Sequence, residues 1–201
     1  MKRVCLFGGT FDPPHLGHIT MAESVIERLG VDEVWFIPTY LPPLKKREVT
    51  PSHHRLEMLK RLLRNKENFK IETIELERKG RSYTIDTIQT LRSRYPNVIF
   101  YFLIGADQVA QLHRWHRIEE LMTLIRFIGV ERPGYSWDSS FKVERIPAPK
   151  VDISSTEIRN MLKAGEKVGS YVPEEVYSYI KEHRLYGYGK NEENRKGAAK
   201  Q

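Results

Sequence analysis

KRVCLFGGTFDPPHLGH, residues 2–18, joins a short apolar run to a pair of glycines, two prolines and two histidines that flank a third glycine, Gly17. The apolar residues at 4–7 predict a buried strand that ends at Gly8. Residues 16–29 then carry apolar side chains at helical spacing and stop at Gly30, a typical helix C-cap. A strand, a glycine turn and a helix in this order predict the first βα unit of a parallel sheet.

The same alternation continues along the chain. Strands are predicted at residues 2–8, 33–38, 69–76, 98–105 and 124–130, and helices at 16–29, 54–63, 84–94 and 115–123. This order predicts an α/β fold with a Rossmann-like, doubly wound parallel sheet. Helices predicted at 155–164 and 173–183 form a small C-terminal helical annex. Since ligands bind at the carboxyl ends of such strands, the turn Gly8-Gly9-Thr10 marks the expected site.

The length of 201 residues is that of one domain. We expect a single domain over residues 1–186, of which 149–186 are the helical C-terminal part. Residues 187–201 contain mainly Gly, Lys, Asn and Glu without apolar periodicity, and predict a disordered tail. One cysteine cannot form an intrachain disulfide, and Cys5 lies in an apolar run, so we expect a core residue rather than a nucleophile.

The charge and hydropathy of the chain limit the kinds of molecule that we expect it to bind. The 33 basic and 26 acidic residues give a net charge of +7, which suits a phosphate-rich ligand. No aromatic pattern of an RNA-binding sheet is present, so no nucleic-acid partner is expected. Most of the basic residues at 55, 60, 61, 64 and 66 are expected on a solvated helix face. The apolar runs at 4–7 and 98–104 are too short for a signal peptide or a bilayer span, which predicts a cytoplasmic protein without a membrane partner.

The turn and the first helix together form a predicted phosphate cradle. Gly8 and Gly9 let the backbone approach a ligand, and the helix start offers free amides to an anion. His15 and His18 are three residues apart, so both rings lie on one side of the first turn. A zinc site would need further ligands that the sequence does not supply, and no metal site is expected. The alternative is that the histidines cap a tight turn.

A second motif, ISSTEIR, occupies residues 153–159. Ser154 and Glu157 have the spacing of a capping box, so a well-started helix is one interpretation. Arg159 favours a second interpretation, an anion-binding site, because a guanidinium near free helix amides and hydroxyls can bind an anion. Two phosphate cradles together indicate a polyphosphate ligand.

The two motifs resemble the H-x-G-H signature and the I-S-S-T-x-I-R element of the nucleotidyltransferase superfamily. Other segments are similar, in the same order, to those of bacterial nicotinate-nucleotide adenylyltransferases. These segments are SYTIDT at 82–87, FLIGAD at 102–107, Trp115, RPG at 132–134 and YVP at 171–173. The resemblance covers residues 1–186. It implies that nicotinate mononucleotide attacks the α-phosphorus of ATP, giving deamido-NAD and pyrophosphate, with Mg²⁺ held through the ATP phosphates.

The resemblance also assigns roles to residues. Thr10, His15 and His18 are implied to be catalytic. The implied ATP-binding residues are Gly8, Gly9, Thr10, Phe11, His15, His18, Lys45, Gly105, Asp107, Ile153, Ser154, Ser155 and Arg159. The implied residues for nicotinate mononucleotide are Thr39, Tyr83, Thr84, Trp115 and Arg132. Thr39 stands where the family usually has Asn, and Leu44 where it has His.

For the acceptor, residues 83–84 lie at a predicted helix start, whose free amides suit the nicotinate carboxylate. Trp115 is expected to stack on the pyridine ring, although a core aromatic is an equal reading of this residue from the sequence. Two other functions stay open. One is a sister adenylyltransferase acting on nicotinamide mononucleotide or phosphopantetheine, and the other is a non-catalytic nucleotide-binding regulator. The sequence also leaves open whether the chain forms a homo-oligomer.

Overall fold

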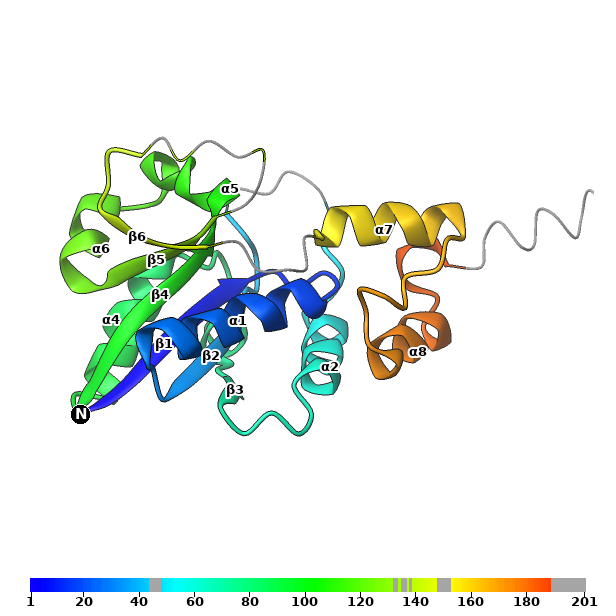
Figure 1. The fold of residues 1–201 in the computed structure, drawn as a ribbon, viewed down its shortest axis with the longest axis horizontal. Helices are drawn as coiled ribbons and strands as arrows, with labels where there is room; N and C mark the ends of the chain where they lie inside the picture. Colours follow the sequence, from blue (N-terminus) through cyan, green and yellow to red (C-terminus); the bar gives the residue numbers. More distant parts are fainter. Residues whose placement is uncertain (44–47, 132–133, 135–136, 138, 148–152, 189–201) are drawn as a thin grey trace, which may run out of the picture.

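A parallel sheet of six strands forms the centre of the molecule (Figure 1). The computed structural model describes residues 1–43, 48–131, 134, 137, 139–147 and 153–188. The strands are β1 (Lys2–Gly9), β2 (Glu33–Pro38), β3 (Phe69–Ile71), β4 (Val98–Gly105), β5 (Arg126–Val130) and β6 (Val143–Ile146). Their order is β3-β2-β1-β4-β5-β6, and every pair is parallel. The predicted doubly wound, Rossmann-like sheet is confirmed.

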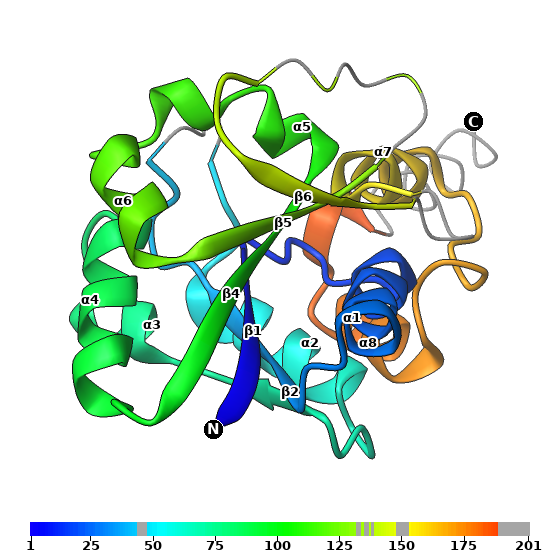
Figure 2. The same ribbon diagram turned by 60° about the vertical axis from the view of Figure 1, so that its left-hand side comes forward.

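Helices cover both faces of the sheet (Figure 2). Cys5 and Phe7 of β1 point to one face and Val4 and Leu6 to the other, as strand geometry requires. The first face is covered by α1 (Leu16–Leu29) and α2 (Ser52–Leu62), and apolar side chains of α7 (Ser155–Ala164) and α8 (Glu174–Glu182) join the same core cluster. The second is covered by α3 (Ile74–Arg78), α4 (Thr84–Arg94), α5 (Ala106–Val109), the 3₁₀ turn η1 (Leu112–Arg114) and α6 (Ile118–Leu124). Burial on both faces explains why the central strands are almost wholly apolar.

Helices α7 and α8 and the 3₁₀ turn η2 (Leu185–Gly187) form the C-terminal annex, beside α2 in Figure 1. The described chain continues to Tyr188, whose ring lies 6.0 Å from that of Tyr177. The described part of the chain therefore includes the first two residues of the predicted tail, and residues 189–201 lie outside it. Among the described residues, no helix combines the length and apolar character needed to span a bilayer.

Two predicted elements differ clearly from the structure, and one strand of the sheet was not predicted. The strand predicted at 69–76 ends at Ile71, and α3 begins at Ile74, because Glu75 and Glu77 suit the first turn of a helix. The helix predicted at 115–123 begins only at Ile118, since Arg117 adopts a left-handed conformation with φ of 53°. Strand β6 was not predicted, because its two central residues are charged and exposed, as is common for edge strands.

The basic residues around α2 are mostly solvated, as expected, with one exception. Lys60, Arg64 and Lys66 are exposed. Arg55, however, is only 1% exposed, and the prediction of a solvated face is wrong for this residue. Its guanidinium donates to backbone carbonyls, which replace the hydrogen bonds to water that burial removes.

The amino-terminal edge of the sheet holds a partly buried carboxylate, Glu33, with two lysine partners, which we expect to contribute to stability. Burial opposes ionisation of Glu33, but hydrogen bonds from Lys2, Lys70 and Trp35 lower its pKa to about 2. Glu33→Gln should therefore reduce the free energy of unfolding by about 2 kcal/mol at neutral pH. Because the native pKa is depressed, this contribution is present above the ordinary pKa and is lost as pH falls towards about 2.

Urea unfolding of the Glu33→Gln variant across this pH range measures the effect. Glu67→Gln, a substitution at an exposed position, is the matched control and should change little at any pH. If the loss of unfolding free energy in Glu33→Gln did not become smaller under acidic conditions, the assignment of the stabilisation to the ionised carboxylate would be contradicted.

Cys5 is fully buried on β1, which confirms its expected place in the core. Burial in apolar surroundings raises the pKa of its thiol well above the usual range. Since only the thiolate reacts with alkylating agents, iodoacetamide should leave the native protein unmodified at mildly alkaline pH. Mass spectrometry should detect one added group only after unfolding in guanidinium chloride, and alkylation of the native protein would show that β1 opens readily.

Candidate active site

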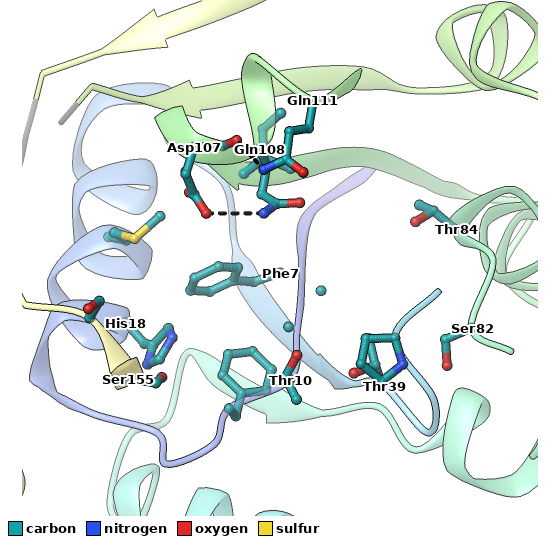
Figure 3. A pocket seen from close by; sticks show the side chains of 18 of the residues that line it. Phe7, Thr10, His18, Thr39, Ser82, Thr84, Asp107, Gln108, Gln111 and Ser155 are labelled. Carbon is teal, nitrogen blue, oxygen red and sulfur yellow. Dashed lines mark hydrogen bonds between the residues drawn. The ribbon is translucent and has the colours of Figure 1, made fainter. Parts of the chain in front are cut away.

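A cleft of about 830 Å³ opens where β1, β2 and β4 end. Its size is that of a typical site for small ligands. In Figure 3, His18 and Ser155 lie on one side of it, Thr39, Ser82 and Thr84 on the other, and Asp107 with Gln108 closes a third side. The cleft brings together almost all the described residues that the sequence singled out: Gly8, Gly9, Thr10, Phe11, His15, His18, Thr39, Tyr83, Thr84, Gly105, Asp107, Trp115, Ile153, Ser154, Ser155 and Arg159.

The glycine turn after β1 is shaped by aromatic rings packed against it. A Cβ on Gly8 would lie 2.8 Å from the ring of Phe102, and one on Gly9 would lie 2.8 Å from the ring of Phe11. Either side chain would collide with a ring. The glycines are therefore required by packing as well as by access to a ligand. Phe11 is buried, and its ring lies 5.0 Å from that of His18, 5.6 Å from that of Phe7 and 5.7 Å from that of Phe36. It therefore packs among core aromatics as well as against the histidine.

His15 and His18 lie side by side at the start of α1, with ring centroids 3.7 Å apart. His15 is the N-cap residue, and its backbone N–H donates to Nδ1 of His18 at 3.1 Å. Because Nδ1 accepts this bond, the proton of the neutral ring lies on Nε2, which can donate to a ligand. Gly17 permits the arrangement, since a Cβ there would lie 3.0 Å from Nδ1 of His15. Capping of α1 thus uses Nδ1 of His18 and not Nε2.

The second motif is attached to the loop of the first. Ser154 and Glu157 form the capping box of α7, as one interpretation of the sequence predicted. Ser155 Oγ donates to the carbonyl of Pro13 at 2.9 Å, and Nη1 of Arg159 donates to that of Asp12 at 2.7 Å. These two bonds hold the amino end of α7 beside the histidines, although the motifs are about 140 residues apart in sequence.

The opposite side of the cleft is built around the start of α4. Tyr83 is its N-cap residue, and no side chain caps this helix end. Trp115 lies in the extended segment after η1, with its ring 5.9 Å from those of Phe102 and Phe127. It therefore packs against core aromatics and also lines the cleft. Neither Trp115 Nε1 nor Thr39 Oγ1, both buried, has a hydrogen-bond partner among the described residues.

Asp107 lies on α5, directly after β4, and lines the cleft. Its carboxylate accepts from the side-chain amide of Gln108 at 3.1 Å (Figure 3). A Cβ on Gly105 would lie 2.7 Å from Oδ1 of Asp107, so the glycine leaves room for this carboxylate. Two other expected site residues, Lys45 and Arg132, lie outside the described part of the chain.

Several residues that line the cleft were not found by sequence reasoning. They are Met21, Glu75, Arg81, Gln108, Gln111, Arg114 and His116. His116 packs its ring 4.5 Å from that of Tyr83. Burial raises the pKa of Glu75, while hydrogen bonds from the Ser82 and Thr87 hydroxyls oppose the rise. Gln108 and Gln111 follow the end of β4, a position that could have indicated them.

Known proteins resemble this chain in sequence and in structure. Residues 6–161 match the family model described as Cytidylyltransferase-like. A probable nicotinate-nucleotide adenylyltransferase of Oceanobacillus iheyensis is 46% identical over 191 residues, covering 95% of this chain and 100% of that protein. Nicotinate-nucleotide adenylyltransferase of Bacillus subtilis is 44% identical over 187 residues, covering 92% and 99%. Plasmodium falciparum nicotinic acid mononucleotide adenylyltransferase complexed with NaAD has a TM-score of 0.81 at 24% identity, covering 94% and 99%.

Proposed function

Because the chain belongs to the family of nicotinate-nucleotide adenylyltransferases, we propose that its cleft holds ATP and nicotinate mononucleotide side by side. The enzyme transfers the adenylyl group of ATP to nicotinate mononucleotide in NAD biosynthesis. A phosphate oxygen of the mononucleotide attacks the α-phosphorus of ATP, and the bond from that phosphorus to the bridging oxygen breaks. The products are deamido-NAD and pyrophosphate, so no covalent bond to the protein is needed.

One observation carries the proposal most strongly. A single cleft has the two histidines and the start of α7 on one side and the uncapped start of α4 on the other (Figure 3). The first side offers donors to phosphates, and the second offers backbone amides to a carboxylate. Two anionic groups of different kinds can thus be held a short distance apart. Placing both substrates in one cleft supplies the proximity that a two-substrate reaction requires.

The transition state has increased charge on the α-phosphate, and the turn carries donors for it. His18 would donate from Nε2, and His15 and Thr10 would complete the set of groups around the phosphate. His18 is the more accessible histidine, whereas His15 is 4% exposed and lies beneath it. Since the cap bond holds the His18 ring before substrate binds, its donor needs little rearrangement during the reaction.

The β- and γ-phosphates are assigned to the start of α7. Its free amides and dipole favour an anion, and Ser155 and Arg159 line the same side. In the described structure, two nitrogens of Arg159 contact Asp12 O and Thr156 Oγ1. Arg159 therefore holds the loop and contributes its positive charge to the phosphate side at the same time.

The described residues fit a Mg²⁺ ion that arrives with ATP. Glu75, Asp107 and Glu131 line the cleft, but among the described residues no group of three or more His, Cys, Asp or Glu could hold a metal by itself. Mg²⁺ prefers phosphate oxygens and water to a cage of protein ligands. Asp107, beside the cleft, is the carboxylate we assign to this ion. When bound, the ion would neutralise charge on the triphosphate.

Nicotinate mononucleotide is assigned to the side formed by α4. The nicotinate carboxylate would accept from the amides at Tyr83 and Thr84, of which the Tyr83 N–H donates to the carbonyl of Arg81 at 3.1 Å in the described structure. Trp115 would stack on the pyridine ring. Thr39 offers a buried hydroxyl without a partner among the described residues, which suits a contact with this substrate. The assignment of Arg132 to the mononucleotide phosphate comes from the resemblance alone.

Pyrophosphate release tests the function directly. The purified protein is mixed with ATP, Mg²⁺ and one of three acceptors: nicotinate mononucleotide, nicotinamide mononucleotide or phosphopantetheine. We expect rapid release with the first, slow release with the second and only background with the third. Chromatography should identify deamido-NAD as the product in the first mixture. No release with any acceptor would indicate a nucleotide-binding regulator instead.

A further inference from the structure

We propose that Arg55 is a positioning residue that fixes the ATP turn and the acceptor loop relative to one another. Arg55 lies near the start of α2, the helix that Figure 1 shows between the sheet and the annex, and is not among the residues that line the cleft. The inference rests on the proposed use of the cleft by two substrates. It assigns the alignment of those substrates to a side chain that touches neither of them.

The contacts of Arg55 join segments from three parts of the chain. Its Nη1 donates to the carbonyl of Thr10 at 2.8 Å, which belongs to the turn after β1. Its Nη2 donates to the carbonyls of Thr39 at 2.8 Å and Tyr40 at 3.3 Å, in the segment after β2. Its Nε donates to the carbonyl of Thr50 at 2.7 Å, just before α2. One planar group thus connects the ends of two neighbouring strands.

The connection continues from Tyr40 to the start of α4. The backbone N–H of Tyr40 donates to Ser82 Oγ at 2.9 Å, and the N–H of Ser82 donates to the carbonyl of Leu41 at 3.0 Å. Ser82 directly precedes Tyr83, the N-cap residue at which we place the nicotinate carboxylate. A continuous set of bonds therefore runs from the turn under the ATP α-phosphate to the acceptor side.

Burial makes this connection rigid. Arg55 is 1% exposed, and a buried charge that loses its partners is strongly unfavourable, so the carbonyls cannot easily move away. A guanidinium can also satisfy several acceptors in one plane, which the single ammonium of lysine cannot do. Transfer requires the mononucleotide oxygen to be aligned with the α-phosphorus, and small misplacements of reacting groups can reduce a rate by about 10²-fold.

The test compares Arg55→Lys and Arg55→Met with Arg61→Lys. Arg61 is on the same helix, donates to the carbonyl of Glu175 and packs over the ring of Tyr179. It supports the annex and has no contact with the cleft, so it controls for a general loss of stability. For each protein we would measure kcat, both KM values and the midpoint of thermal unfolding.

We expect Arg55→Lys to remain folded and to lose at least about tenfold in kcat, with smaller changes in either KM, because each half of the cleft stays intact. Arg55→Met should lose at least as much. Arg61→Lys should keep its kcat even if its unfolding midpoint falls. A native-like kcat for folded Arg55→Lys, an equal loss for Arg61→Lys, or failure of both Arg55 variants to fold would overturn the proposal. An inactive native enzyme would instead refute the proposed function.

Discussion

Replacing His18 by alanine is expected to lower kcat on the order of 10²-fold or more, while ATP binding weakens far less. The reason is the position of its two nitrogens. Nδ1 accepts the backbone N–H of His15 at 3.1 Å, so the ring is already oriented and Nε2 carries the donor proton. Losing one preorganised donor to a transition-state oxyanion typically costs about 10²–10³-fold in kcat. A ground-state phosphate, which carries less charge at that oxygen, loses less from the same change.

His18→Asn separates catalysis from helix capping. Its Oδ1 can take the place of Nδ1 as the acceptor for His15 N–H, but the shorter side chain has no donor where Nε2 was. We expect a stability close to native for His18→Asn, with a kcat as low as that of His18→Ala. His113→Ala, at an exposed position outside the cleft, should have the native kcat. Steady-state kinetics measure kcat, and calorimetric titrations measure ATP binding. Native-like turnover in folded His18→Asn would show that capping is the whole role of His18.

The second large effect is a preference for the acid mononucleotide over the amide, of roughly 10²-fold or greater in kcat/KM. The start of α4 has free amides, the positive end of the helix dipole and no capping side chain. A carboxylate accepts from such amides, whereas a carboxamide can turn one donor towards them. Desolvated donors left without an acceptor cost about 1–3 kcal/mol each, so two of them account for this preference.

Thr84→Pro tests the role of the backbone at this helix end. Thr84 is the first residue of α4, a position where proline is well tolerated, and Tyr83 already has the extended conformation that precedes proline (φ −79°, ψ 126°). The variant should therefore fold while lacking one amide donor. We expect it to reduce kcat/KM for the acid more than for the amide.

Trp115→Ala is the matched comparison, because stacking does not distinguish the two rings. It should impair both mononucleotides to a similar extent. Melting curves for both variants show whether they are folded. Equal kcat/KM values for acid and amide with the native enzyme would refute the assignment of the carboxylate to α4, although adenylyl transfer itself would stand.

The parts of the fold that depend on local pattern could be predicted from the sequence. Strands β1, β2 and β4 are apolar on both faces, so their runs are long and easily identified. The prediction for 69–76 is wrong at its carboxyl end, because apolar residues alternate with polar ones both at 69–71 and at 74–76, a pattern that fits a strand, whereas the second part forms the helix α3. Strand β6 has two charged residues in four, so its own sequence does not predict a strand. It is a strand because it pairs with β5.

The sequence by itself determined the local structure of the two motifs that we propose bind phosphates, because glycine turns, capping residues and helix starts act through neighbours in the chain. It also determined that α4 begins near Thr84, the helix end to which we assign the nicotinate carboxylate. Only the tertiary structure decided how these parts meet. Ser155 reaches Pro13 across 142 positions, and Arg55 reaches Thr10 across 45. An arginine among other basic residues looks solvated in sequence, since its burial depends on carbonyls that the parallel sheet brings to one edge. Local hydrogen bonds follow residue spacing, whereas these long-range bonds exist only after strands distant in sequence have paired.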